Sequence, residues 1–371
     1  MKIKECRPLA AVSRFLARKD IVFSAKRYGI DAMGAMAQGL FCSLLIGTII
    51  KTLGQQIGLA FLVDVGSYAS SMSGAAMAIA IGYALKAPPL VLFSLATVGY
   101  AANALGSTSL IEGKSGAGGP LAVLFIAILA AECGKAVSKE TKVDILVTPA
   151  VTILVGVALS AWWAPAIGTA AAAVGDFVRF ATELQPFLMG ILVSVVIGIA
   201  LTLPISSAAI CAAIGLTGLA GGAAVAGCCA TMVGCAVLSF RDNGVGGLIS
   251  QGLGTSMLQM GNIVKKPRIW LPVILTSAVT GPLSTCLFRL QMNDPAGGVA
   301  SGMGTCGLVG QIGVYAGWVN DVANGTKAAI TAMDWVGLIL ISFVLPALLT
   351  WLFGLLFRRF GWIKDGDLKL D

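Results

Sequence analysis

The sequence contains no histidine among its 371 residues, and it has few charged residues of either sign. Without an imidazole, no Ser-His or Cys-His catalytic pair and no phosphohistidine can form within this chain. The nine cysteines are odd in number, lie mostly in apolar runs and form no CxxC pair. We therefore interpret them as small packing residues, and we expect no metal site, no cofactor and no catalytic residue.

Charged residues make up only 11% of the chain and aromatic residues 7%, whereas 57% of the residues are hydrophobic. A soluble domain carries about 25% charged residues, so this composition excludes an ordinary soluble fold. The mean hydropathy is +0.91. The 47 glycines allow helices to approach one another closely inside a bilayer. The composition therefore predicts an all-α polytopic membrane protein.

Ten apolar runs approach the length of about 20 residues that a helix needs to cross about 30 Å of hydrocarbon. The sixth and seventh runs nearly touch, so nine or eleven spans remain possible. We divide the chain into a basic N-terminal arm (1–30), a membrane domain (31–358) and a C-terminal tail (359–371). The runs cover residues 32–50, 67–85, 89–106, 120–134, 145–164, 186–203, 205–219, 222–240, 270–287 and 335–357.

Lysine and arginine are concentrated in residues 1–30 and in alternate loops between the apolar runs. Because positively charged loops stay in the cytoplasm, this pattern predicts that both termini are cytoplasmic. The formal net charge of +8 therefore indicates contact with the lipid headgroups of the bilayer rather than with nucleic acid.

Two Gly-rich segments, 244–262 and 297–311, are too apolar for solvated loops and too interrupted for spanning helices. Each contains a GxGT core, at residues 252–255 and 302–305, and a glutamine follows each core. Non-helical backbone at membrane depth is tolerated where it lines a cavity. We predict two re-entrant hairpins that enter from opposite faces and hold a solute where they meet. The alternative is that the glycines only allow close helix packing.

Polar side chains in or beside the apolar runs are the candidates for solute binding, since polar groups within a bilayer are costly. The alternatives are structural. Glu132 and Asp144 would pair with the lysines of loop 135–142 at the headgroups, and hydroxyls beside prolines would cap broken helices. The candidate substrate-binding residues are Glu132, Asp144, Thr148, Ser206, Ser207, Gly252, Gly254, Thr255, Ser256, Gln259, Asn262, Gly302, Gly304, Thr305 and Gln311.

Four stretches, residues 134–149, 203–207, 252–259 and 301–311, resemble the membrane-embedded EIIC component of the bacterial phosphoenolpyruvate-dependent sugar phosphotransferase system (PTS). More narrowly, they are similar to the branch of that family that contains perfringolysin-O-regulator-like proteins. The similarity extends over most of the chain that follows the N-terminal arm.

The resemblance implies an IIC-like transporter scaffold in the bacterial inner membrane, a homodimer, a sugar as the small polar solute, and alternating access. Separate IIB and IIA proteins would supply the phosphoryl group, so this chain would be at most the permease component. The sequence leaves two other functions open. The first is a proton-coupled secondary transporter, and the second is a membrane sensor or regulator that binds its ligand without net transport.

Overall fold

The computed structural model describes residues 14–111, 116–293 and 298–370, and these ranges are largely helical. Their one β-like feature is an isolated bridge between Gly218 and Met292. The prediction of an all-α fold is therefore confirmed for the part of the chain that the structure describes. Residues 1–13 of the predicted basic arm lie outside it.

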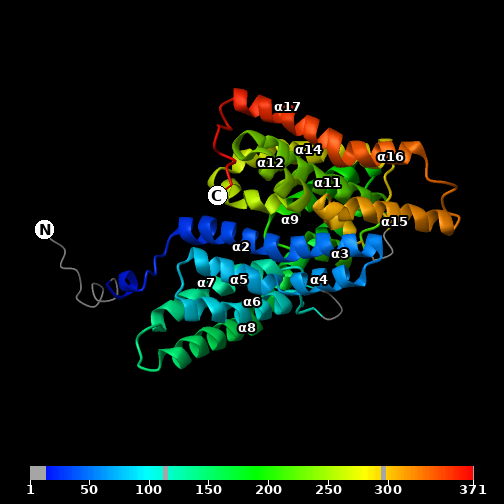
Figure 1. Ribbon diagram of the computed structural model, residues 1–371. Helices are drawn as coiled ribbons and strands as arrows, with labels where there is room; N and C mark the ends of the chain where they lie inside the picture. Colours follow the sequence, from blue (N-terminus) through cyan, green and yellow to red (C-terminus); the bar gives the residue numbers. More distant parts are fainter. Residues whose placement is uncertain (1–13, 112–115, 294–297, 371) are drawn as a thin grey trace.

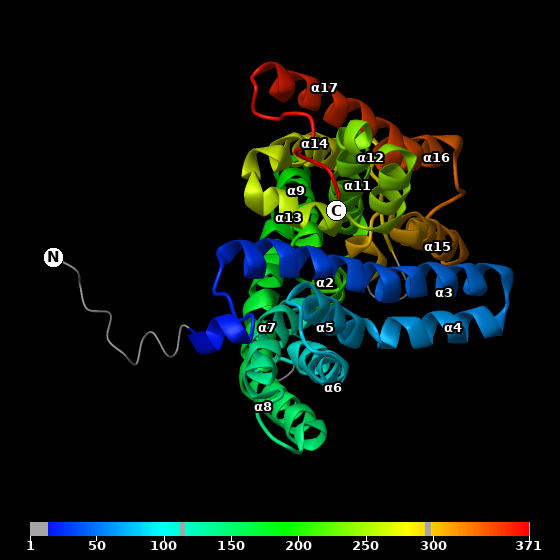
Figure 2. The same cartoon turned by 60° about the vertical axis from the view of Figure 1, so that its left-hand side comes forward.

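The first half of the chain forms one helical bundle, whose core joins α2, α5, α6, α7 and the first part of α8. Helices α3 and α4 form a hairpin that projects from this bundle (Figure 2). The elements of this half are η1 (Arg27–Asp31), α2 (Ala32–Leu40), η2 (Phe41–Leu45), α3 (Ile46–Ile57), α4 (Ala60–Ser71), α5 (Ser73–Ala84), α6 (Pro89–Gly106), α7 (Gly119–Val137) and α8 (Asp144–Thr182).

The second half is arranged around α11, a helix whose apolar window is 89% buried. Its elements are α9 (Pro186–Thr202), α10 (Ser207–Ala213), α11 (Gly218–Leu238), α12 (Phe240–Ile249), η3 (Ser250–Gly254), η4 (Ser256–Gln259), α13 (Met260–Lys265), η5 (Pro267–Trp270), α14 (Leu271–Pro282), η6 (Leu283–Leu287), η7 (Ala300–Gly302), η8 (Cys306–Leu308), α15 (Val309–Ala323), α16 (Ala332–Ile339), η9 (Leu340–Val344) and α17 (Leu345–Arg359).

Helix α8 connects the two halves, because its 39 residues are long enough to pack against both cores. Ala164 belongs to the core of the first bundle, whereas Val178 packs with α9, α10 and α11. Figure 1 shows that the start of α2 and the end of α17 lie at the same end of the molecule. We call this the tail end, since residues 360–370 also lie there.

Seven helical stretches within the described residues are long and apolar enough to cross a membrane, and α5 and α9 are shorter apolar helices. Together they account for nine of the ten predicted runs. The structure therefore shows a multi-pass membrane protein. The exact number of spans and the cytoplasmic placement of the termini stay predictions.

The predicted span at 205–219 is wrong. The structure places only α10 there, a helix of seven residues, which at 1.5 Å per residue is about 10 Å long and cannot cross a bilayer. Gly215 and Gly218 follow it with φ angles of 59° and 65°, a left-handed conformation that ends a helix. The segment is apolar because it is packed against α8 and α9, which hydropathy alone does not distinguish from a span.

Candidate functional site

The first Gly-rich segment follows the path of a hairpin. Helix α12 and the π-helical turn η3 lead inward to Thr255, whose backbone is extended (φ −159°, ψ 144°). The turn η4 and helix α13 then lead back. Asp242 before the turn and Lys266 after it both contact the C-terminal tail, so the two arms begin and end at the tail end of the molecule.

The second Gly-rich segment reaches inward from the other end. Its described part begins at Gly298, and Gly297 lies outside the described residues. Asn293 before the segment donates a hydrogen bond to Asp321 near the end of α15 at 2.8 Å. Figure 1 shows this end of α15 opposite the tail end. Between Asn293 and α15 the chain turns through η7 and η8.

The two GxGT motifs meet in the interior. The Thr305 hydroxyl donates a hydrogen bond to the Gly252 carbonyl oxygen at 2.5 Å, and the Thr305 side chain is fully buried. Gly304 lies against α11 with φ +53°, and a Cβ there would come within 2.6 Å of the Cys228 Cβ. Only glycine fits this position, because both the backbone conformation and the close approach exclude a side chain. We call this meeting point the GxGT junction.

The break between α9 and α10 supplies further hydroxyls to the GxGT junction. The Ser207 hydroxyl donates to the Gly302 carbonyl oxygen at 2.7 Å. The hydroxyls of Thr202 and Ser256 lie 2.9 Å apart and share one hydrogen bond. These four residues come from three separate segments of the chain, and all are buried.

Each of two glutamines beside the junction has a side-chain oxygen without a hydrogen-bond partner among the described residues. Gln311 donates to the Ser342 hydroxyl at 2.9 Å, and Gln251 donates to the Ser239 hydroxyl at 2.8 Å. The side-chain carbonyl oxygens of both glutamines are buried and have no hydrogen-bond partner among the described residues. An unpaired buried acceptor costs about 1–3 kcal/mol, so these oxygens are candidate acceptors for ligand hydroxyls. Sequence reasoning missed Gln251, although it adjoins Gly252.

Apolar side chains and π-helical turns enclose the GxGT junction. Leu45 of η2, Met232 of α11 and Cys306 form a buried cluster with Phe41 and Met303 against it. Three π-helical turns contribute here, since η2 carries Phe41, η3 carries Gly252, and η9 carries the serine bonded to Gln311. Such turns are frequent at functional sites.

Three of the predicted site residues lie away from the junction. Glu132 accepts a hydrogen bond from the Tyr28 hydroxyl at 3.0 Å and pairs with the ammonium of Lys135 at 3.0 Å. Asp144 accepts hydrogen bonds from the Thr148 hydroxyl and from the Lys139 amide, both at 2.6 Å. The ion pair of Glu132 with Lys135 matches the structural alternative of pairing with the loop lysines. Asp144 differs from it, because its partners are a hydroxyl and a backbone amide rather than a lysine ammonium.

The hydroxyls of two other predicted residues, Ser206 and Thr255, accept hydrogen bonds from backbone amides. Ser206 caps α10 by accepting a hydrogen bond from the Ala209 amide at 3.1 Å, and Thr255 caps η4 by accepting one from the Met257 amide at 3.1 Å. Gly254 lies at the junction, where a Cβ would come within 2.3 Å of the Phe41 ring. The structure thus brings Ser207, Gly252, Gly254, Ser256, Gly302, Gly304, Thr305 and Gln311 together, with Thr255 at the turn beside them.

The side chains of Gln259 and Asn262 bind the C-terminal tail. Their amide groups donate to the carbonyl oxygens of Leu368 and Lys369, each at 2.9 Å. Asn243, on the other arm of the hairpin, also donates to the Leu368 carbonyl at 2.8 Å. The tail therefore bridges both arms of the first Gly-rich hairpin.

An ion pair completes this contact between the tail and the hairpin. The carboxylate of Asp367 lies 2.5 Å from the Lys266 ammonium. Burial raises the pKa of Asp367, but the hydrogen bonds from Lys266 and from the Lys364 amide outweigh it and hold the pKa below its usual value. Leu368 beside it is 1% exposed. We call the contacts of residues 363–370 with the hairpin the tail clamp.

Interrupted helices that meet at a buried polar junction inside an all-helical, multi-pass bundle define the architecture of a membrane transport protein. The chain belongs to the EIIC family of the phosphotransferase system, whose family model (Phosphotransferase system, EIIC) matches residues 30–370. No curated protein and no solved structure matches the chain. The predicted family is therefore confirmed, and the structure is that of an IIC-like membrane permease component.

Proposed function

We propose that the chain carries a sugar across the bacterial inner membrane by alternating access and that the sugar binds at the GxGT junction. The observation that carries this proposal is the hydrogen bond from Thr305 to the Gly252 carbonyl. It joins two interrupted segments that reach inward from opposite ends of the molecule. In this proposal both segments are re-entrant hairpins, and residues 31–358 form the transport domain.

The chemistry of the GxGT junction suits an uncharged polar solute. Its polar side chains are hydroxyls and amides, such as those of Thr202, Ser256, Thr305 and Gln311. The unpaired carbonyl oxygens of Gln251 and Gln311 are acceptors for sugar hydroxyls. A hydrogen bond from the ligand removes the cost of leaving a buried acceptor without a partner. The ion pairs of Lys135 with Glu132 and of Lys266 with Asp367 lie elsewhere, at a helix end and in the tail.

The proposal includes separate partners and a defined orientation. Both termini lie in the cytoplasm, where separate IIB and IIA proteins phosphorylate the incoming sugar. The permease is a homodimer. Membership of the family supports the partners and the homodimer, and the distribution of basic loops supports the orientation.

Uptake into proteoliposomes tests the proposed function. Purified protein is reconstituted, and the flux of labelled sugars is measured with and without a phosphorylated IIB protein in the lumen or bath. We expect flux that depends on the phosphodonor. A flux that follows the proton gradient instead would identify a secondary transporter, and thermal stabilisation by a sugar without any flux would identify a sensor.

A further inference from the structure

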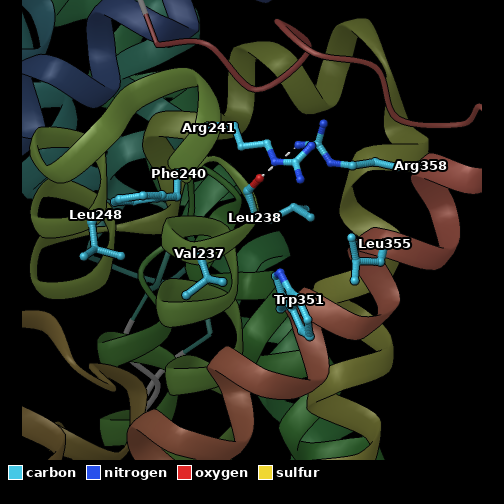
Figure 3. Close-up of a pocket in the computed structure, with 9 residues that line it drawn as sticks. Val237, Leu238, Phe240, Arg241, Leu248, Trp351, Leu355 and Arg358 are labelled. Atoms are coloured by element: carbon cyan, nitrogen blue, oxygen red, sulfur yellow. Dashed lines mark hydrogen bonds between the residues drawn. The ribbon is translucent and has the colours of Figure 1, made fainter.

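A pocket with a basic mouth and an apolar floor lies between α12 and α17, away from the GxGT junction. Its volume is about 340 Å³. Arg241 and Arg358 line it, together with apolar residues that include Leu248, Trp351 and Leu355. Figure 3 shows the guanidinium groups of the two arginines turned toward each other above Leu238, with Trp351 and Leu355 farther along α17. We call it the two-arginine pocket.

One of the two arginines has its charge uncompensated, and the other is paired only with an exposed carboxylate. Arg358 pairs with Asp365 at 2.5 Å and donates to the Leu238 carbonyl oxygen at 3.3 Å, but the Asp365 side chain is 78% exposed. Arg241 has no hydrogen bond or ion pair among the residues that the structure describes. The neighbouring carboxylate of Asp242 accepts hydrogen bonds from tail amides instead. Two guanidinium groups that face each other are stabilised by an anion that contacts both.

The position of the two-arginine pocket selects the kind of anion. Arg358 lies in the last turn of α17, which belongs to a stretch long and apolar enough to cross a membrane. Trp351 lies two turns earlier, about 10 Å along the helix at 1.5 Å per residue, and it is 51% exposed. Because arginines near helix ends reach to the interface, we infer that the two arginines lie at headgroup level and that Trp351, about 10 Å deeper, contacts the acyl chains. A free phosphate would meet the arginines but leave the apolar floor in water.

We propose that the two-arginine pocket binds an anionic phospholipid, whose phosphate contacts Arg241 and Arg358 and whose acyl chain lies along Trp351 and Leu248. Pockets of basic residues between membrane helices are known to recognise anionic headgroups. Because α12 is one arm of the first Gly-rich hairpin, the bound lipid holds that arm against α17. This binding site is independent of which solute the permease carries.

Lipid binding to the delipidated full-length protein tests the site. Native mass spectrometry and thermal unfolding are measured with phosphatidylglycerol, with phosphatidylcholine and with inorganic phosphate. We expect phosphatidylglycerol to bind and stabilise the protein. Arg241→Gln should weaken this binding about fivefold, the effect of one basic residue at an anionic surface. The control is Arg179→Gln, an exposed arginine of α8 outside the pocket, which should bind phosphatidylglycerol as the wild type does.

Three results would overturn the proposal. They are equal stabilisation by the two phospholipids, equal stabilisation by inorganic phosphate, and unchanged phosphatidylglycerol affinity in Arg241→Gln. The first two need only the wild-type protein, so the test remains decisive if the variant fails to fold. Arg241→Lys offers a further measurement, because it keeps the charge but loses the paired hydrogen bonds of the guanidinium.

Discussion

Thr305 links the two Gly-rich segments through one hydroxyl, so its replacement tests the GxGT junction directly. Thr305→Val keeps the side-chain volume but leaves the buried Gly252 carbonyl without its donor, which costs about 1–3 kcal/mol of stability. We expect the variant to fold, to bind sugar more weakly and to transport less. Thermal shift with sugar and uptake into proteoliposomes measure these effects.

Thr350→Val is the matched control for this prediction. Thr350 is also fully buried, and its hydroxyl lies 2.8 Å from that of Thr276 in a contact between α17 and α14. We expect a similar loss of stability with normal uptake, because this pair lies away from the junction. Normal binding and uptake by Thr305→Val would show that the solute binds elsewhere.

Lys135 shows why a buried charge in this chain need not mark a binding site. The side chain is 1% exposed, and its ammonium donates to the carbonyl oxygens of Asp20 at 2.7 Å and Leu85 at 3.0 Å. The ammonium also forms an ion pair with Glu132. It therefore holds the segment before η1 against the ends of α5 and α7. Sequence alone gives the spacing of Glu132 and Lys135 but not these carbonyl partners, which come from residues far apart in the chain.

Removing this ammonium should destabilise the protein strongly. Lys135→Met leaves the largely buried Glu132 carboxylate with the Tyr28 hydroxyl but without its cation, so we expect a loss that approaches the about 3–5 kcal/mol of a broken buried ion pair. The double variant Lys135→Met/Glu132→Gln removes the lone charge and should recover part of the melting temperature. Thermal unfolding in detergent compares the two variants, and a double variant less stable than the single one would contradict the pairing.

At the scale of elements, hydropathy predicted most of the helices but not their ends. The run at 145–164 belongs to α8, which continues through Pro165 to Thr182 because its later turns pack against α9 and α10. Helix α15 was not predicted, since glycines and polar residues lower its hydropathy although Gly313 and Trp318 are buried. The wrongly predicted span at 205–219 shows the converse, because its hydropathy is high but its helix is short. Pro204 precedes the helix, and glycines with positive φ end it.

The tail clamp is an element that the sequence does not reveal, because residues 359–371 read as a short solvated tail. The clamp closes over both arms of the first hairpin through backbone carbonyls. Truncation after Gly361 should therefore increase amide hydrogen exchange in η3, η4 and α13, while exchange in α6 of the other bundle stays unchanged. Unchanged exchange in the hairpin would mean that the tail does not restrain it.

The ion pair of the clamp gives it a defined pH dependence. The native pKa of Asp367 is below its usual value, so the carboxylate stabilises the folded state above the unfolded pKa of about 3.9. This stabilisation is lost as the pH falls through the native pKa. We expect Asp367→Asn to lower the melting temperature above pH ~4 by the equivalent of at most about 1 kcal/mol, since the Lys266 side chain is half exposed. A difference from the wild type that persisted below the native pKa would contradict this assignment.

At the scale of the whole molecule, two helical cores meet at the GxGT junction. The pairing of the two GxGT motifs could be anticipated, because the motifs repeat within one sequence and interrupt apolar runs on either side of one helix. The partners that enclose them could not, because Phe41, Thr202 and Ser342 come from segments that no local pattern connects. Contacts between distant segments depend on how whole bundles dock.

Alternating access requires these two bundles to move relative to each other, and a cavity between them allows the movement to be tested. The cavity of about 380 Å³ is lined by Gln38 and Tyr83 of the first bundle and by Gly261 and Asn262 of the second. Gln38 is exposed, and a Cβ at Gly261 would make only ordinary contacts at 3.6 Å or more. Both positions should therefore accept cysteine.

A reducible bifunctional maleimide that joins Gln38→Cys to Gly261→Cys should abolish uptake, and cleavage of the linker should restore it. The background replaces Cys42, Cys133 and Cys286, the exposed cysteines of the described residues, and also Cys6. The control joins Gln38→Cys to Tyr83→Cys, two positions on helices α2 and α5 of the same bundle, and should leave uptake intact. Full uptake by the cross-bundle conjugate would mean that the solute crosses without relative movement of the bundles, because a covalent bridge forbids their separation at this cavity.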